Sequence, residues 1–284
     1  MKNRVNKKIG ALFVAVVLFA VSFDLRAQAV TGQRLALTVR DAASVGLWRD
    51  WGVSPRVYQF AAIAQGVSMS GSVKQWTIFG DVDISGGLLS PKLVPVKKFS
   101  LTGYYGIVDV RVGTLRQVWQ STSGNWSIHV GASLSNYLFA SYVSRFQNAS
   151  SALTDLFQPE LHFTAEYNLP NSNPLIVLPG WFTAYGTVSI APFGLAYRPG
   201  FAYIDNYTSG REASDYVFSS YRASVAWLPR VQTELGVRFN LRSGNRIGLA
   251  WRWDCRASHG TALWDYEQAT QSIVLNFVIL LKKN

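Results

Sequence analysis

The sequence predicts an all-β chain folded as a transmembrane, antiparallel up-and-down β-barrel of about 12 strands. Three observations lead to this fold class. Apolar and polar residues alternate along many segments, which is the pattern of a strand with one apolar face. Of the 284 residues, 15% are charged and 14% are aromatic, and mean hydropathy is only +0.10. Such values suit strands that present one face to lipid and the other to water.

The first part of the chain, residues 1–29, has the features of a secretory signal peptide. Met1–Lys8 is basic, Ile9–Phe23 is an apolar run, and Ala27–Ala29 offers a small-x-small cleavage pattern. The apolar run is short for a helix that must cross a bilayer core of about 30 Å. We therefore expect cleavage after Ala29 and export of the remainder.

Residues 30–54 are predicted to form an N-terminal lead segment, in the periplasm or in the lumen. Arg34–Arg40 alternates well, but the stretch that follows it is irregular. The barrel domain is expected to occupy residues 55–284.

Further along the chain, period-two alternation marks a series of expected strands. They are Val73–Ser85, Lys97–Gln120, Trp126–Ser135, Phe157–Leu169, Trp181–Ile190, Phe193–Asp205, Asp215–Leu228, Val231–Arg242, Arg246–Cys255 and Gln271–Asn284. Lys97–Gln120 is long enough for two strands, with Gly113 near their junction. Ser121–Asn125, Pro170–Pro174 and Arg242–Asn245 have the composition of turns or breakers.

The last segment shows the pattern clearly. Its apolar face carries Ile273, Leu275, Phe277, Ile279 and Leu281, and its mixed face carries Ser272, Val274, Asn276, Val278 and Leu280. Alternation alone is also typical of a soluble β-sandwich. The runs here exceed the about 5–6 residues of a usual strand, which favours membrane strands. Aromatic residues that we place near strand ends also favour lipid contact: Trp126, Tyr167, Trp227, Trp251 and Trp253.

In this layout the chain, over roughly residues 55–282, resembles the small and medium outer-membrane β-barrels of Gram-negative bacteria. The resemblance implies an outer-membrane location, contact with outer-membrane lipid and insertion by the barrel assembly machinery. In that class the final strand commonly serves as the assembly signal and ends in an aromatic residue. Here Phe277 is followed by Val278–Asn284, which departs from that pattern.

The polar face is expected to line the lumen. Its candidate residues are Glu160, His162, Glu166, Arg222, Glu234, Arg238, Arg242, Arg252 and Asp254. If these charges neutralise each other across the lumen, the barrel is plugged and mainly structural or recognitive. If they line opposite walls, a narrow path for a solute or ion remains.

Other chemistry is weakly indicated. His129 and Ser133 invite comparison with barrel-embedded lipid hydrolases, but both share the face assigned to the lumen, so we interpret them as polar lumen residues. No metal site or cofactor is predicted. The single cysteine, Cys255, excludes an internal disulfide. The net charge of +11 is scattered rather than clustered, which argues against nucleic-acid binding.

The leading functional hypothesis is a porin-like narrow channel or a structural, accessory component of the outer membrane. Two alternatives stay open from sequence. One is a lipid hydrolase embedded in the barrel, and the other is a secreted soluble β-sandwich that binds carbohydrate or protein.

Overall fold

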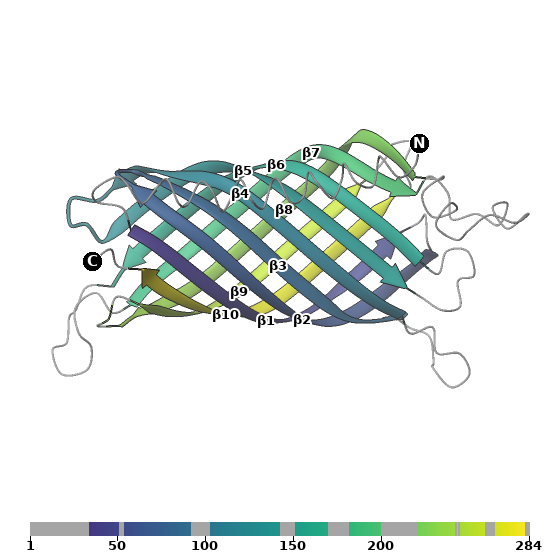
Figure 1. Ribbon diagram of the computed structural model, residues 1–284, viewed down its shortest axis with the longest axis horizontal. Helices are drawn as coiled ribbons and strands as arrows, with labels where there is room; N and C mark the ends of the chain where they lie inside the picture. The colour runs from purple at the N-terminus through teal and green to yellow at the C-terminus, as the bar shows by residue number, and fades with distance from the viewer. Residues whose placement is uncertain are drawn as a thin grey trace, which may run out of the picture.

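The computed structural model describes residues 34–50, 54–91, 103–142, 151–169, 182–199, 221–241, 243, 245–258 and 265–281. These residues form ten long strands that run diagonally around one barrel (Figure 1). The strands are β1 (Arg34–Asp50), β2 (Ser54–Val73), β3 (Trp76–Pro91), β4 (Gly103–Gln120), β5 (Trp126–Tyr142), β6 (Ser151–Asn168), β7 (Phe182–Pro199), β8 (Tyr221–Asn240), β9 (Arg246–Ser258) and β10 (Tyr266–Leu281).

Every strand pairs antiparallel with its sequence neighbours, and β1 pairs with β10 to close the barrel. The all-β, antiparallel up-and-down prediction is therefore confirmed. The β-sandwich alternative is wrong, because a single sheet closes on itself and no second sheet packs against it in the described ranges. Within those ranges, no helix is both long enough and apolar enough to cross a membrane.

The expected number of about 12 strands is too high, because several strands are longer than predicted. Lys97–Gln120 contributes one strand, β4, and Gly113 lies inside it. Trp181–Ile190 and Phe193–Asp205 were expected as separate strands, yet β7 runs through both from Phe182 to Pro199.

Residues 34–50 also differ from the expected lead segment, since they form β1. Their register runs from Leu35 opposite Leu281 to Asp50 opposite Tyr266. In the irregular stretch after Arg40, polar and apolar residues are mixed on both faces, although the side chains still alternate between inward and outward. Ser44 and Trp48 point inward and are buried, while Val45 and Leu47 are exposed. The expected signal peptide lies outside the described residues.

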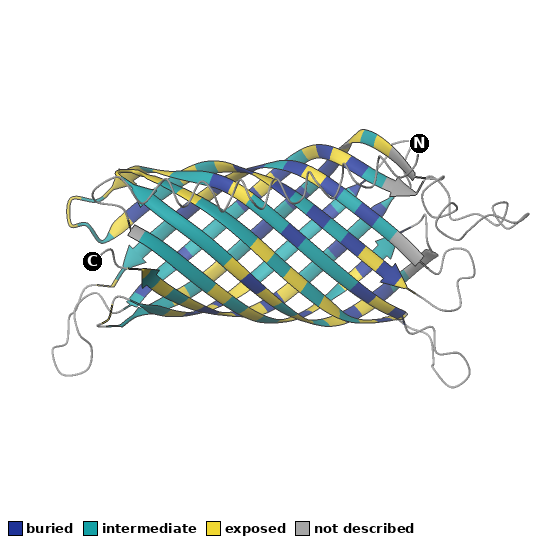
Figure 2. Cartoon of the chain, in the orientation of Figure 1, coloured by how far each residue is buried: buried dark blue, intermediate teal, exposed yellow. Residues whose placement is uncertain are grey.

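Exposed residues alternate with buried or half-buried ones along the strands (Figure 2). In β10, Ile273, Leu275, Phe277, Ile279 and Leu281 are exposed, whereas Val274 is fully buried. The predicted faces of this strand are therefore confirmed, with the apolar face outside. Large apolar side chains cover the outer wall on the other strands as well.

The two ends of the barrel differ. At the turn end, where β1 begins and β10 ends, Lys74 and Gln75 join β2 to β3, and 121–125 and 241–245 form two more short connections. At the opposite loop end, longer stretches of chain join β3 to β4, β5 to β6 and β7 to β8. Two connections depart from this contrast: residues 169–181 join β6 to β7 at the turn end, and only residues 51–53 join β1 to β2 at the loop end.

Aromatic side chains gather on the outer wall at the turn end. Trp126 packs on Tyr167 with ring centroids 4.6 Å apart, and Phe182 packs on Phe239 at 5.1 Å. The expected positions of three other aromatics are wrong. Trp251 and Trp253 lie inside β9, and Trp227 lies inside β8, which continues through Pro229 without a turn.

Candidate functional site in the barrel lumen

The loop half of the lumen is filled by apolar, mainly aromatic side chains, which we call the aromatic layer. It consists of Trp48, Tyr58, Phe60, Leu89, Tyr105, Tyr137, Phe139, Leu156, Ala196, Leu228 and Tyr266. Trp48 lies 5.4 Å from Phe139 between ring centroids, so a side chain from β1 reaches one from β5. The prediction that polar side chains line the lumen is therefore wrong at this end.

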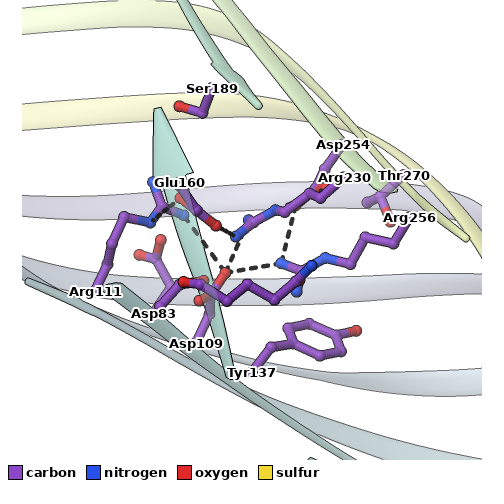
Figure 3. Close-up of polar contacts among 12 residues, drawn as sticks. Asp83, Asp109, Arg111, Tyr137, Glu160, Ser189, Arg230, Asp254, Arg256 and Thr270 are labelled. Carbon is purple, nitrogen blue, oxygen red and sulfur yellow. Dashed lines mark hydrogen bonds and ion pairs between the residues drawn. The ribbon is translucent and has the colours of Figure 1, made fainter. Parts of the chain in front are cut away.

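Next to the aromatic layer, toward the turn end, lies a set of charged side chains that we call the ionic layer. It consists of Asp109, Arg111, Glu160, Arg230, Asp254 and Arg256 (Figure 3). Its three guanidinium groups match its three carboxylates in charge. The members come from β4, β6, β8 and β9, so the layer reaches across the lumen.

Arg230 is the centre of the ionic layer. Its guanidinium donates to Asp109 on β4 at 3.0 Å, to Asp254 on β9 at 2.8 Å and to Glu160 on β6. The residue is only 1% exposed, and Glu160 is 2% exposed. A buried guanidinium is tolerated only where carboxylates compensate the loss of water, and three do so here.

Arg256 connects the two layers. It donates to Asp109 at 2.9 Å, and its guanidinium carbon lies 3.6 Å from the centroid of the Tyr137 ring. The Tyr137 hydroxyl in turn donates to Gln268 on β10 at 2.6 Å. Charge, aromatic surface and hydrogen bonds therefore form one connected plug, and a cavity of about 90 Å³ remains beside it along β1, β2 and β3.

Further ion pairs line the wall between the ionic layer and the turn end. Arg252 donates to Glu234 at 2.8 Å and lies 3.4 Å from Asp83 on β3. Arg238 donates to Glu166 at 2.7 Å. Arg40 pairs with Asp83 at 2.9 Å.

These pairs line a cavity of about 710 Å³ that extends to the turn end, which we call the vestibule. Hydroxyl side chains of β1, β2 and β3 line one side of it, including Thr38, Ser68 and Ser70. Arg238, Arg246 and other charged residues line the remainder. The space is large enough for a small polar solute or for a short peptide segment.

A serine–histidine contact is present in the lumen, but not between the predicted residues. His129 contacts Ser127 at 3.3 Å, whereas Ser133 Oγ lies 2.6 Å from His162 Nε2. His162 Nδ1 contacts Ser189 Oγ at 2.7 Å. Both ring nitrogens are thus engaged by hydroxyl groups.

Ser133 is poorly placed to act as a nucleophile. It is buried, and it is not among the residues that line the vestibule, although His162 and Ser189 are. Both Ser133 and His162 face inward, away from the wall where lipid would lie. The contact is best explained as part of the hydrogen-bonded packing of the lumen.

Seven of the nine predicted lumen residues can be placed in the structure. Their side chains all point inward and take part in the network: Glu160, His162, Glu166, Glu234, Arg238, Arg252 and Asp254. The side chain of Arg222 and the whole of Arg242 lie outside the described part of the chain. Within that part, no group of three His, Cys, Asp or Glu side chains is arranged to hold a metal ion.

Sequence reasoning missed the centre of the plug. Arg230 follows Pro229, a residue type that indicates the end of a strand, so alternation predicts no face for it. Asp109 and Arg111 lie in the segment expected to divide into two strands, where no face was assigned. Continuing the inward face of β5 beyond Ser135 would have reached Tyr137 and Phe139 and predicted the aromatic layer.

No family model and no curated protein matches the sequence. Among solved structures, the outer membrane protease OmpT from Escherichia coli matches with 7% identity and a TM-score of 0.49, covering 90% of this chain and 100% of that one. The translocator domain of the autotransporter NalP from Neisseria meningitidis matches with 12% identity and a TM-score of 0.38, covering 93% and 97%. The beta domain of the Bordetella autotransporter BrkA matches with 12% identity and a TM-score of 0.41, covering 86% of this chain and 98% of that one.

The fold and the lumen together define a class of protein. It is a closed antiparallel β-barrel of ten strands, with an apolar outer wall and a lumen that its own side chains occlude.

Proposed function

We propose that the chain is a β-barrel of the Gram-negative outer membrane that acts as a closed structural or accessory component, not as an open channel. Its vestibule would receive a small polar solute or a segment of a partner. The single observation that carries this proposal is the bonding of Arg230 to carboxylates on three other strands across the lumen.

The outer wall supports a membrane location. Isolated exposed apolar residues are ordinary on a soluble protein, but a wall covered by them needs an apolar environment. On this barrel they occur on every strand; Ile63, Leu161 and Leu235 are 74%, 65% and 58% exposed. A closed barrel also leaves no strand edge unpaired, which is the condition for strands to lie in lipid.

The distribution of connections supports an orientation. Outer-membrane barrels place short turns in the periplasm and longer loops outside the cell. The turn end, and with it the vestibule, would therefore face the periplasm. Solutes outside the cell would meet the aromatic layer, while a periplasmic partner would have direct access to the vestibule.

Two measurements test this proposal. The folded chain should be recovered in the outer-membrane fraction and should migrate differently on SDS gels before and after boiling. Purified barrels inserted into planar bilayers should produce no stepwise conductance. Recovery in the soluble periplasm would refute the membrane location, and steady conductance steps of the wild type would refute the plug.

A further inference from the structure

A charged side chain projects from the middle of the outer wall. Asp41 lies near the midpoint of β1, opposite Leu275 on β10 and Gln65 on β2. It is exposed and belongs to the same outward row as Val39 and Val45. Its carboxylate therefore points toward the region that hydrocarbon would occupy if the barrel lies in a membrane.

Asp41 is unusual among the outward charges of the described strands. Arg49 and Glu267 lie at the loop end and pair with each other at 2.6 Å. Arg116 lies toward the turn end, over the Trp76 ring. Asp155 lies toward the loop end of β6. Each of these lies toward a rim of the barrel, where water or lipid headgroups are within reach.

The surroundings of Asp41 form a polar patch with small neighbours, which we call the β1 patch. Gln65 Nε2 donates to Asp41 Oδ1 at 3.2 Å. Ala43 and Ala61 are exposed beside this pair. Between the two alanines stands Ile63, which is 74% exposed.

Hydrocarbon offers no hydrogen-bonding partner to the polar groups of the β1 patch. After the Asp41–Gln65 hydrogen bond, the carboxylate still has free acceptor sites, and the Gln65 amide keeps one N–H donor. Charged and polar groups at membrane depth are costly unless they find hydrogen-bonding partners, and such groups mark interaction sites. Small residues beside them allow another backbone to approach closely.

The groups left over are complementary to those of a second identical patch. A two-fold axis along the membrane normal, passing between β1 and β2, would bring Asp41 of one copy opposite Gln65 of the other, and the reverse. The remaining N–H of each Gln65 would then donate to the carboxylate of the other copy. Ile63 of each copy would fill the shallow space over the other copy's Ala43.

We propose that two copies of this chain associate in the membrane through the β1 patch, with Asp41 and Gln65 forming reciprocal hydrogen bonds across the interface. This inference rests on the proposed membrane location of the barrel. It adds a lateral partner, which is the same chain, to a component whose lumen is closed.

Cross-linking in isolated outer membranes tests the interface. In a Cys255→Ser background, Ala43→Cys should give a covalent dimer with a short bis-maleimide reagent. A matched cysteine on β8, Leu235→Cys, should give none, because it faces lipid away from the patch. Adding Asp41→Leu or Gln65→Leu to Ala43→Cys should lower the dimer yield at least tenfold, whereas adding Thr233→Leu on β8 should leave it unchanged.

Folding is scored in the same samples by the shift in gel migration on boiling. Replacing Asp41 by leucine makes the outer wall more apolar and so suits it to lipid. The Asp41→Leu variants should therefore fold and retain the shift in gel migration. Membrane-embedded, folded Ala43→Cys that gives no dimer, or that cross-links to a chain of another size, would overturn the self-association alone. A dimer yield unaffected by Asp41→Leu would overturn the role of Asp41. Absence of the chain from the membrane fraction would overturn the proposed location as well.

Discussion

At the scale of single residues, the lumen depends on Arg230. One guanidinium donates to carboxylates from three strands, and two of these, Asp109 and Asp254, also accept from Arg256. Ion pairs of this kind add little net stability compared with a well-packed apolar core. Their removal one partner at a time is costly, because the remaining charges stay buried without compensation.

Replacement of Arg230 by methionine should therefore lower the free energy of unfolding by about 3–5 kcal/mol. Glu160, Asp109 and Asp254 would be left with an excess of negative charge in the lumen. The measurement is urea unfolding in detergent micelles, followed by tryptophan fluorescence.

The matched control for this variant is Arg116→Met, which removes an exposed guanidinium on the rim and should cost no more than about 1 kcal/mol. Adding Glu160→Gln to Arg230→Met should recover part of the loss, since it removes one orphaned charge. Equal destabilisation by Arg230→Met and Arg116→Met would show that the ionic layer does not hold the strands together.

At the scale of strands, Pro192 and Pro229 explain part of the excess in the predicted strand number, because the sequence predicts a strand end beside each of them and β7 and β8 continue through both. Pro159, Pro192 and Pro229 lie in β6, β7 and β8. The register shifts between Phe157 and Leu161 and between Ala191 and Phe193. Proline removes a ladder hydrogen bond and is tolerated in a strand only at an edge or a bulge. The same residue type marks turns, so sequence alone did not distinguish a bulge inside a strand from the end of one.

A side chain compensates for part of the disrupted ladder. Gln158 Nε2 donates to the backbone carbonyl of Leu228 at 2.7 Å, and both residues are buried. Bulges turn neighbouring side chains, and this one lies beside Glu160 and Arg230. The irregular part of the wall is thus also the part that positions the ionic layer.

The faces of the strands were predictable where the strands are regular. In β5, β6, β9 and β10, apolar and polar residues alternate strictly, so all the apolar side chains of a strand share one face. A membrane barrel turns that apolar face outward, which is where the structure has it. The identity of the partners was not predictable. Arg230 and Asp109 are 121 positions apart in the sequence, and only the closure of the barrel brings them together.

Close approach between strands gives a second prediction. A Cβ on Gly131 in β5 would lie 1.9 Å from the carbonyl oxygen of Thr114 in β4. Gly131→Ala should therefore force the β4–β5 pair apart and destabilise the barrel by about 1–3 kcal/mol. Gly80→Ala in β3 is the matched control, since its added methyl would meet nothing within 4 Å.

These two alanine variants are compared by the temperature at which each loses its compact migration on gels. Gly131→Ala should unfold at a lower temperature than the wild type, and Gly80→Ala should not. If the two behave alike, the close contact between β4 and β5 is relaxed in the folded protein at negligible cost.

At the scale of the whole molecule, the lumen has two barriers in series and a cavity behind them. The aromatic layer excludes ions because it is mainly apolar, and the ionic layer obstructs the passage because its paired side chains reach across the lumen from β4 to β8 and β9. Either layer alone should suffice to prevent conduction. The vestibule remains accessible from the turn end in both cases.

Removal of one layer should therefore leave planar bilayers silent. Trp48→Ala with Phe139→Ala opens the aromatic layer, and Arg230→Ala with Glu160→Ala opens the ionic layer without changing its net charge. Only the fourfold variant is expected to conduct. Conductance in the Trp48→Ala, Phe139→Ala variant alone would mean that the ionic layer is no barrier.

The pairing of β1 with β10 has a consequence for biogenesis. Leu35 cannot pair with Leu281 until β10 has been synthesised, so the closing seam joins the first and the last strand of the described barrel. Before that moment, both outermost strands expose unpaired amide and carbonyl groups that invite aggregation. A partner that covers these edges before closure is expected to reduce aggregation, and closure itself should be slow because its contacts are so remote in sequence.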